Sequence, residues 1–415
     1  MKLNEEEKAM LAGEFGPLRQ WAMDHQIKVG RYLKAPDFVP VMQAHIMADT
    51  ESLGEAGVKW LEAWTELPKK DRLVRIPTIT DPRGTDFAAA SRLKQQTWMV
   101  ELERRAINAF QSLGVLMTDT CINYQTIMPP VFGEHTAYGD TGVVIYSNSV
   151  CGARSNFEGG PSALSAGLTG RTPRYGFHLD QHRQATLVVH TKWTPRELNE
   201  WGALGAYVGR CAGDYWQVPA IVGIERSPTS DEMKHFGAAM ASFGSVALFH
   251  IVGVTPEAPT LKDVAPNAHE LRSYNVTEAD VRQLQAKYGG TIDAVDLVVF
   301  SAPQLSLVEL QQIAILLEGR QTEIPLLAIT SPQVKPDADR MGITDKIEAA
   351  GASVLSGMCF YQSYAREMAE SNGWKRLATN SAKLSNILGG YGYTPALLSM
   401  EECIDVACDG GRLRK

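Results

Sequence analysis

Several features that mark common protein classes are missing from this chain. Its 415 residues include six cysteines and no CxxC pair, which is too few for a disulfide scaffold. The longest apolar runs, such as residues 245–254, have about half the length of a membrane span. The acidic start, residues 1–7, lacks the apolar core of a signal peptide. We therefore expect a cytoplasmic protein that does not enter membranes.

The charge and the absent motifs exclude further classes. A net charge of −7 argues against a nucleic-acid-binding protein. No GxGxxG sequence follows an expected strand, and the GxxxxGKS/T, HExxH and GxSxG patterns are absent. Hydride transfer, nucleotide hydrolysis, zinc proteolysis and serine hydrolysis therefore lack their usual sequence signatures.

What is present is the composition of a soluble globular protein, with 44% hydrophobic and 21% charged residues. The apolar pattern predicts a helical segment over residues 1–70 and two α/β regions over 71–265 and 266–415. Alternating strands and helices are typical of doubly wound, mostly parallel sheets. Strands are expected at 73–80, 115–120, 185–191, 220–225, 245–254, 294–300, 324–330 and 352–358. Helices are expected at 5–12, 18–33, 54–67, 86–113, 277–288, 306–317, 339–351 and 399–407.

Two cysteines end expected strands although they lie far apart in the chain. Cys121 follows the apolar segment 115–120, and Cys359 follows 352–358. Open α/β sheets place their chemistry at the C-terminal ends of strands, so the two thiols could reach one metal centre. Taken singly, each cysteine is also explained as a small buried apolar side chain.

Glycines are dense over residues 131–185, and polar side chains crowd between them. A long loop of this kind inside a compact domain is typical of a functional site, although a plain surface loop would have the same composition. Arginine and lysine would bind a carboxylate or phosphate there. The polar residues of this segment are Asn148, Ser149, Arg154, Asn156, Arg171, Arg174 and His178. Other polar clusters hold His45, Asn380, Ser381 and Lys383.

Together these clusters resemble the large, catalytic subunit of the aconitase X family. The likeness covers almost the whole chain, and the combination of NSxxGARxN with GGPSAL is long and specific. The matching segments are 10–16 (MLAGEFG), 44–45 (AH), 148–156 (NSVCGARSN), 159–164 (GGPSAL), 170–176 (GRTPRYG) and 379–383 (TNSAK).

The resemblance implies a hydro-lyase with an aconitase-like, multi-lobed α/β fold around a central cleft. Its substrate would be a small hydroxy acid, with cis-3-hydroxy-L-proline favoured and 5-phosphomevalonate as the alternative. An iron–sulfur cluster or a single iron would act as the Lewis acid. A separate small swivel-domain subunit is implied too, because these residues contain no such domain.

The resemblance also implies roles for individual residues. Cys121 and Cys359 would bind the iron. The expected catalytic residues are Ser381, Lys383, His45 and His178. The expected substrate-binding residues are Asn148, Ser149, Arg154, Asn156, Arg171, Arg174 and Asn380, with Arg154 and Lys383 holding the substrate carboxylate.

Three segments depart from the family pattern. Where many relatives have Gly-Cys-Pro-His, this chain reads Ser301-Ala302-Pro303-Gln304, and the residues after Cys121 and after Lys383 differ too. A thiol is therefore missing at Ala302. Cys151 is the candidate third metal ligand, with a smaller cluster or a single iron as the alternative. The lost thiol and imidazole also leave open a non-catalytic paralogue that binds a ligand or a partner subunit.

Overall fold

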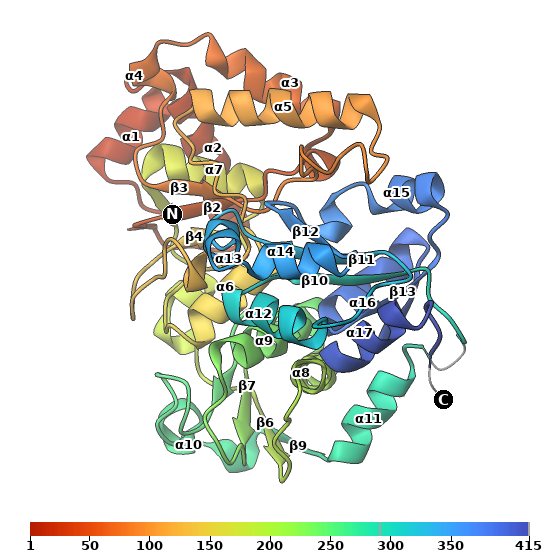
Figure 1. The fold of residues 1–415 in the computed structure, drawn as a ribbon. Helices are drawn as coiled ribbons and strands as arrows, with labels where there is room; N and C mark the ends of the chain where they lie inside the picture. Colours follow the sequence, from red (N-terminus) through yellow and green to blue (C-terminus); the bar gives the residue numbers. More distant parts are fainter. Residues whose placement is uncertain (290–291, 414–415) are drawn as a thin grey trace.

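The computed structural model describes residues 1–289 and 292–413. Three parallel sheets and one short antiparallel ribbon are surrounded by helices (Figure 1). This mixed α/β architecture with mostly parallel sheets is the predicted fold class. No helix within the described residues is long and apolar enough to cross a bilayer.

The N-terminal region is built on a three-stranded parallel sheet with the strand order β3-β2-β4. Its strands are β2 (Ala44–Ile46), β3 (Thr78–Thr80) and β4 (Ala137–Tyr138). Helices pack around this sheet and are drawn in red to orange in Figure 1. They are α1 (Glu5–Ala12), α2 (Pro17–Tyr32), α3 (Thr50–Thr65), α4 (Lys69–Arg72) and α5 (Thr97–Ser112).

Two expected elements of this region are wrong. The helix predicted at 86–113 begins only at Thr97, because the chain before it turns and Lys94 has a φ of +54°, outside the helical region. The strand predicted at 115–120 makes a single bridge, from Leu116 to Ile79. It goes no further as a strand because Asp119 has a φ of +51°.

The glycine-rich segment 131–185 is not the long loop that we expected. It contains α6 (Thr141–Ser149), α7 (Gly160–Thr169) and β5 (Arg171–Pro173), which pairs antiparallel with β1 (Phe38–Pro40). One reason for the glycines is close packing. A Cβ at Gly167 on α7 would lie 2.6 Å from the Thr78 hydroxyl oxygen, so only glycine lets this helix approach the sheet.

The middle of the chain forms a four-stranded parallel sheet with the order β8-β7-β6-β9. Its strands are β6 (Leu187–Thr191), β7 (Pro219–Val222), β8 (His250–Ile251) and β9 (Arg272–Val276). Its helices are α8 (Leu198–Ala212), α9 (Ser230–Gly244), α10 (Leu261–Val264) and α11 (Glu278–Ala286). The strand expected at 245–254 is therefore reduced to β8.

The C-terminal region carries a five-stranded parallel sheet with the order β12-β11-β10-β13-β14. Its strands are β10 (Leu297–Leu305), β11 (Leu326–Thr330), β12 (Ser353–Ser356), β13 (Arg376–Thr379) and β14 (Thr394–Leu397). Its helices are α12 (Leu307–Leu316), α13 (Lys335–Arg340), α14 (Ile343–Ala349), α15 (Ala365–Asn372), α16 (Ala382–Leu388) and α17 (Met400–Cys408).

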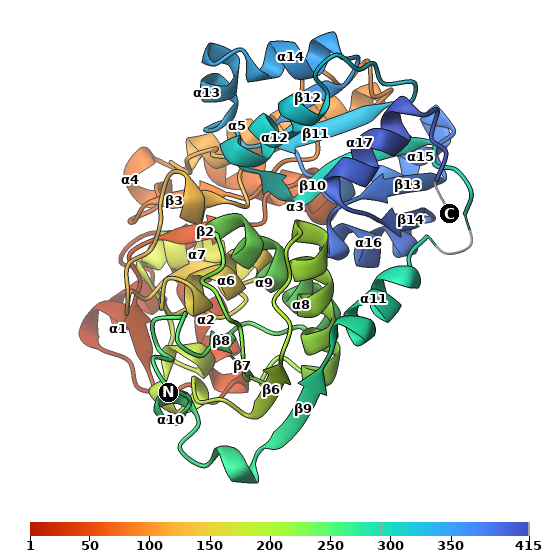
Figure 2. The same ribbon diagram turned by 60° about the horizontal axis from the view of Figure 1, so that its bottom comes forward.

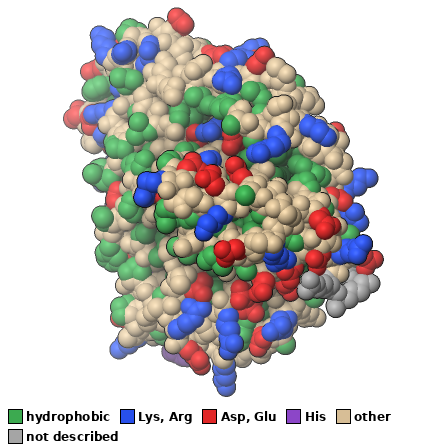
Figure 3. All heavy atoms as spheres, viewed as in Figure 1, with side chains coloured by type: hydrophobic (Ala, Val, Ile, Leu, Met, Phe, Trp, Pro, Cys, Tyr) green, Lys and Arg blue, Asp and Glu red, His purple; other side chains and the backbone are tan. Residues whose placement is uncertain are grey.

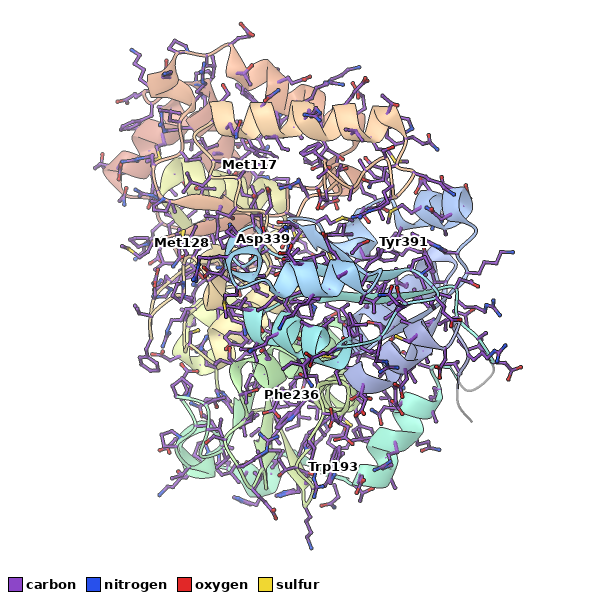
Figure 4. The ribbon with its side chains drawn as sticks, viewed as in Figure 1. Met117, Met128, Trp193, Phe236, Asp339 and Tyr391 are labelled. Carbon is purple, nitrogen blue, oxygen red and sulfur yellow. The ribbon has the colours of Figure 1, made fainter. Side chains whose placement is uncertain are left out.

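Helices α8 and α9 lie between the four-stranded and five-stranded sheets in both views (Figures 1 and 2). Phe236 on α9 is fully buried and packs edge-on against Trp201 of α8, and it is labelled between the two sheets in Figure 4. One apolar cluster continues from these helices into the five-stranded sheet. This shared core fixes the two regions against each other.

Candidate functional site

Strand ends from two sheets meet in one buried place. Strands β2, β3 and β4 run parallel, so the residues at their C-terminal ends lie at one edge of the sheet. The loop after β12 meets this edge through the bridge between Arg83 and Met358. Gln304 of β10 contacts Cys121, and Lys383, which follows β13, contacts Asp140. We call the ionisable residues gathered here the junction cluster. Its members are His45, Asp81, Cys121, Asp140, Cys359 and Lys383.

An ion pair lies at the centre of the junction cluster. The Lys383 Nζ is 3.3 Å from Asp140 Oδ2, and both side chains are almost fully buried. Ser381 caps α16 and thereby places Lys383 in its first turn, while Asp140 caps α6 and accepts a hydrogen bond from the Val143 amide. The ammonium also lies 5.6 Å from the centre of the Tyr361 ring.

The pKa shifts of Lys383 and Asp140 favour the ionised form of this pair. Burial disfavours both charges. For Lys383 the attraction of Asp140 outweighs burial and raises the pKa of the ammonium. For Asp140 the charge of Lys383 and the Val143 amide outweigh burial and lower the pKa of the carboxyl. The site therefore holds a buried positive charge that a substrate carboxylate could approach.

Asp81 differs from Asp140 in its protonation. Burial, and then the negative charge of Asp140, raise the pKa of Asp81 well above its usual value, which favours the neutral form of this carboxyl. The Gln362 Nε2 donates to Asp81 Oδ2 over 3.0 Å. Within the described structure Asp81 Oδ1 has no hydrogen-bond partner although it is buried. A neutral acid with one unpaired oxygen is a potential proton donor.

His45 lies beside this acid. Its Nε2 is 2.9 Å from the Thr120 carbonyl and 3.6 Å from Asp81 Oδ1. Because a carbonyl only accepts, Nε2 carries the ring proton. Burial lowers the pKa of His45, so the ring is neutral. This arrangement agrees with the predicted role of His45 in orienting or moving protons, which stays a prediction.

The two thiols are connected through one side chain. The Gln304 carboxamide accepts from the Cys121 amide over 3.2 Å and donates to the Asp119 and Met358 carbonyls. It therefore joins the Cys121 segment to the residue before Cys359. Burial raises the pKa of both thiols, that of Cys359 to about 12. Without a metal both are thus protonated.

The described residues do not make a complete ligand set for a cluster held by three thiolates. Ala302 lies on the β10 segment between Ser301, which contacts Cys359, and Gln304, which contacts Cys121. No group of three or more His, Cys, Asp or Glu side chains in the described structure is arranged to hold a metal ion. Helix α6 separates Cys151, which lies beyond its C-terminal end, from Asp140 at its start. This helix is about 13 Å long.

Other predicted residues lie at or near the junction cluster. The Ser381 hydroxyl accepts from the Leu384 amide and donates to the Ala302 carbonyl over 2.6 Å. The side-chain nitrogen of Asn380 is buried and has no hydrogen-bond partner among the described atoms. Ser381 therefore supports α16, and Asn380 is the residue with unused hydrogen-bonding capacity.

The polar residues predicted in the glycine-rich segment are engaged elsewhere. The side chains of Asn148, Ser149 and Asn156 hydrogen-bond to main-chain groups. The three arginines pair with carboxylates, Arg154 with Asp180, Arg171 with Glu6 and Glu7, and Arg174 with Asp37. The His178 Nδ1 is 2.9 Å from the His135 Nδ1. Burial lowers the pKa of His178 well below its usual value.

Sequence reasoning did not single out Asp81, Asp140 or Gln362. Asp81 directly follows strand β3, so the strand-end argument used for Cys121 would have found it. Asp140 precedes an apolar helix and is fully explained as its N-cap. Gln362 lies in the short helix Phe360–Gln362, just after Cys359, and carries no signal of its own.

Comparison with known proteins relates this site to a family. Three family models match, the aconitase X first domain over 1–181, the second over 185–286 and the third over 295–409. The phosphomevalonate dehydratase large subunit of Thermococcus kodakarensis is 31% identical over 98% of this chain and 100% of that protein. The chain belongs to the aconitase X family. The predicted resemblance is therefore confirmed.

Other relatives of this aconitase X chain differ in activity and length. The phosphomevalonate dehydratase large subunit of Methanothermobacter thermautotrophicus is 33% identical, with 97% of this chain and 96% of that protein covered. The cis-3-hydroxy-L-proline dehydratase of Hypocrea jecorina is 28% identical, with 99% of this chain but 69% of that protein covered. A crystal structure of Thermococcus kodakaraensis aconitase X in its holo-form matches with a TM-score of 0.87 at 30% identity, covering 98% of this chain and 100% of that chain.

Proposed function

We propose that this chain is the large subunit of a hydro-lyase that removes water from a small hydroxy acid. The observation that carries the proposal is the buried Lys383–Asp140 ion pair beside the neutral Asp81. Two carboxyl groups whose pKa values move in opposite directions are typical of acid–base catalysis. The named dehydratases among the relatives support the same reaction class.

The proposed elimination uses residues of the junction cluster. Lys383 binds the substrate carboxylate. A base removes the proton from the carbon next to that carboxylate, and we assign this step to Asp140, the carboxyl that stays ionised. As the carbon–oxygen bond breaks, Asp81 protonates the departing hydroxyl, which leaves as water. Asp81 is then ionised and Asp140 neutral, and transfer of one proton between them restores the starting state.

We propose cis-3-hydroxy-L-proline as the substrate on the ground of charge. Its carboxylate would bind Lys383, and its ammonium would be stabilised by the carboxyl groups of the cluster. Lys383 is the cation of the junction cluster, and the neighbouring Arg83 is held by Asp119. A phosphorylated acid would need further cations. The rival substrate is 5-phosphomevalonate. It is supported by the phosphomevalonate dehydratase large subunits, which match this chain over almost its whole length.

A substrate comparison tests this proposal. The chain, purified together with its small subunit, is incubated with each compound, and product is followed by mass spectrometry. We expect dehydration of cis-3-hydroxy-L-proline and little turnover of 5-phosphomevalonate. The opposite preference would reverse the substrate assignment. If neither is dehydrated and no other hydroxy acid is, the non-catalytic alternative gains support.

The partner is proposed from the lengths of the relatives. The cis-3-hydroxy-L-proline dehydratases extend beyond the match by about 30% of their length. The relatives named large subunits do not. We propose that this chain works together with a separate small swivel-domain subunit.

The iron centre remains a prediction, with Cys121 and Cys359 as its ligands. Iron and acid-labile sulfide would be measured after anaerobic purification of the chain and of its Cys121→Ser, Cys359→Ser and Cys151→Ser variants. We expect the first two variants to lose iron and the third to keep it. Full iron in both of the first two would contradict the ligand assignment. A metal-free protein that stays inactive after reconstitution would favour a non-catalytic paralogue.

A further inference from the structure

An exposed apolar loop connects two members of the junction cluster. It leaves Cys121 through the short helix Asn123–Gln125 and returns to Asp140 through β4. Val131 and Phe132 at its tip are 67% and 65% exposed, and the adjacent Met42 is 64% exposed. We call Met42, Ile127, Met128, Val131 and Phe132 the apolar lip. Met128 is labelled at the left side of the molecule in Figure 4, where apolar side chains gather along the edge in Figure 3.

The apolar lip is held in place rather than left to move. At its base the rings of Tyr124 and Tyr146 stack with centroids 3.9 Å apart. At its tip Glu134 accepts a hydrogen bond from the Val131 amide over 2.8 Å and another from Gln43. The Phe132 ring lies against Gly152 so closely that a Cβ there would be 2.4 Å from it. Keeping apolar side chains exposed to solvent is unfavourable, and binding of a partner that buries them removes this cost.

A groove continues this surface past the base of the loop. Its cavity of about 470 Å³ is lined by Ile122, Gln125 and Thr126 from the loop and by Asp231, Ser306 and Val308 from the starts of α9 and α12. Val308 is itself 65% exposed. The lip and the groove together present both apolar side chains and polar groups, a mixture that is usual at protein interfaces.

We propose that the apolar lip and this groove are the docking surface of the small subunit. The inference rests on the proposed function, which requires such a subunit. The cis-3-hydroxy-L-proline dehydratases among the relatives carry about 30% more chain than the match covers, which is enough for a further domain in the same polypeptide. The loop that carries most of the lip begins directly after Cys121 and ends directly before Asp140. A subunit bound there would contact the segment that carries both residues.

The test uses a charged lip and a matched control. The double variant Val131→Asp/Phe132→Asp is compared with Ile315→Asp, which changes a 62% exposed residue on α12. Binding of each to the purified small subunit is measured by titration calorimetry. We expect the Kd of the double variant to rise at least about 100-fold and that of the control to change less than about threefold. Circular dichroism checks folding. If the double variant does not fold, Phe132→Ala is used instead, with an expected rise of about tenfold.

The other possible results distinguish a failure of the docking proposal from a failure of the proposed reaction. Full affinity in the folded lip variants would overturn the docking surface and leave the hydro-lyase intact. Dehydration by the wild-type chain alone would overturn the partner and its surface, but again not the reaction. A lip variant that turns a dimer of this chain into a monomer, with small-subunit binding unchanged, would assign the lip to a second copy and overturn the proposal.

Discussion

The junction cluster and the glycine-rich segment are both dense in polar side chains, yet their charged groups lie in different surroundings. In the glycine-rich segment Arg154 and Arg174 pair with carboxylates that are at least partly exposed. In the junction cluster both partners of the Lys383–Asp140 ion pair are almost fully buried. Buried polar atoms without a partner among the described atoms occur in both regions, as Asp81 Oδ1 and His178 Nε2 show, so the buried ion pair beside Asp81 is what distinguishes the junction cluster.

The two regions also differ in the sequence signal that led to them. Glycine density and polarity drew attention to residues 131–185, where the structure has the two helices α6 and α7. The strand-end argument started from Cys121 and Cys359, which lie in the junction cluster near Asp81 and Lys383. Strand ends predict where chemistry can occur, and shifted pKa values mark candidate residues for it.

Replacing Lys383, the buried cation of the junction cluster, should have the largest effect on activity. For Lys383→Met we expect kcat/KM to fall by about 10⁴, near 5 kcal/mol, because substrate binding and the partner of Asp140 are both lost. Arg174→Met, which removes an outer pair with Asp37, should change kcat/KM by less than about threefold. Steady-state kinetics of the folded variants would measure this. Equal losses in both would erase the distinction between the regions.

Asp81→Asn should have the next largest effect. The amide keeps the shape of the side chain but cannot supply an acidic proton, so we expect kcat to fall by about 10³. Burial and Asp140 raise the pKa of Asp81, and the neutral form is the active one. The wild-type rate should thus decline as pH rises through this pKa, and the variant should lack that decline. Asp180→Asn, at an exposed carboxyl paired with Arg154, should keep the wild-type pH profile, and a changed profile there would count against Asp81 as the acid.

Part of the fold and of the site could be predicted from sequence because local signals were clear. The capping pattern at Ser306 and Glu309 correctly predicted the start of α12. Cys121 and Cys359, which the strand-end argument expected in one place, both lie near Lys383 in the structure. The start of α5 was missed because a single left-handed residue, Lys94, interrupts a helical pattern.

The partners of these residues could not be predicted. The contact of Asp81 with Gln362 joins residues 281 positions apart, and no local pattern records such a pairing. The same holds for the ion pairs of the predicted arginines. Whether an arginine binds substrate or an internal carboxylate is decided by the tertiary fold, as Arg171 and Glu7 illustrate.

Asn156→Ala should affect stability rather than catalysis. Its carboxamide donates to the Tyr175 carbonyl and accepts from the Phe177 amide and the Tyr215 hydroxyl. Removing it leaves buried groups unpaired, and we expect a loss of about 3 kcal/mol in the free energy of unfolding. Urea denaturation would measure this, with kcat of the remaining folded enzyme unchanged. If stability were unaltered and KM were raised, the result would instead support the predicted substrate-binding role of Asn156.

Glu158→Gln should have the smallest effect, and it depends on pH. Burial raises the pKa of Glu158 to about 7, against the hydrogen bond from Thr172. An acid whose pKa is higher in the folded state favours folding fully below its unfolded value, near 4.5, and this contribution is lost as pH rises through 7. The neutral amide avoids that loss, so the variant should be more stable than the wild type by about 2 kcal/mol at pH 6 and nearly equal at pH 4.5. Three other acids also have raised pKa values, namely Asp49, Glu51 and Glu103. They titrate in the wild type and in the variant alike, so their contributions cancel in the difference between the two free energies of unfolding. An equal stability difference at both pH values would show that Glu158 is not the titrating group, and burial would then not be what separates its pKa from the unfolded value.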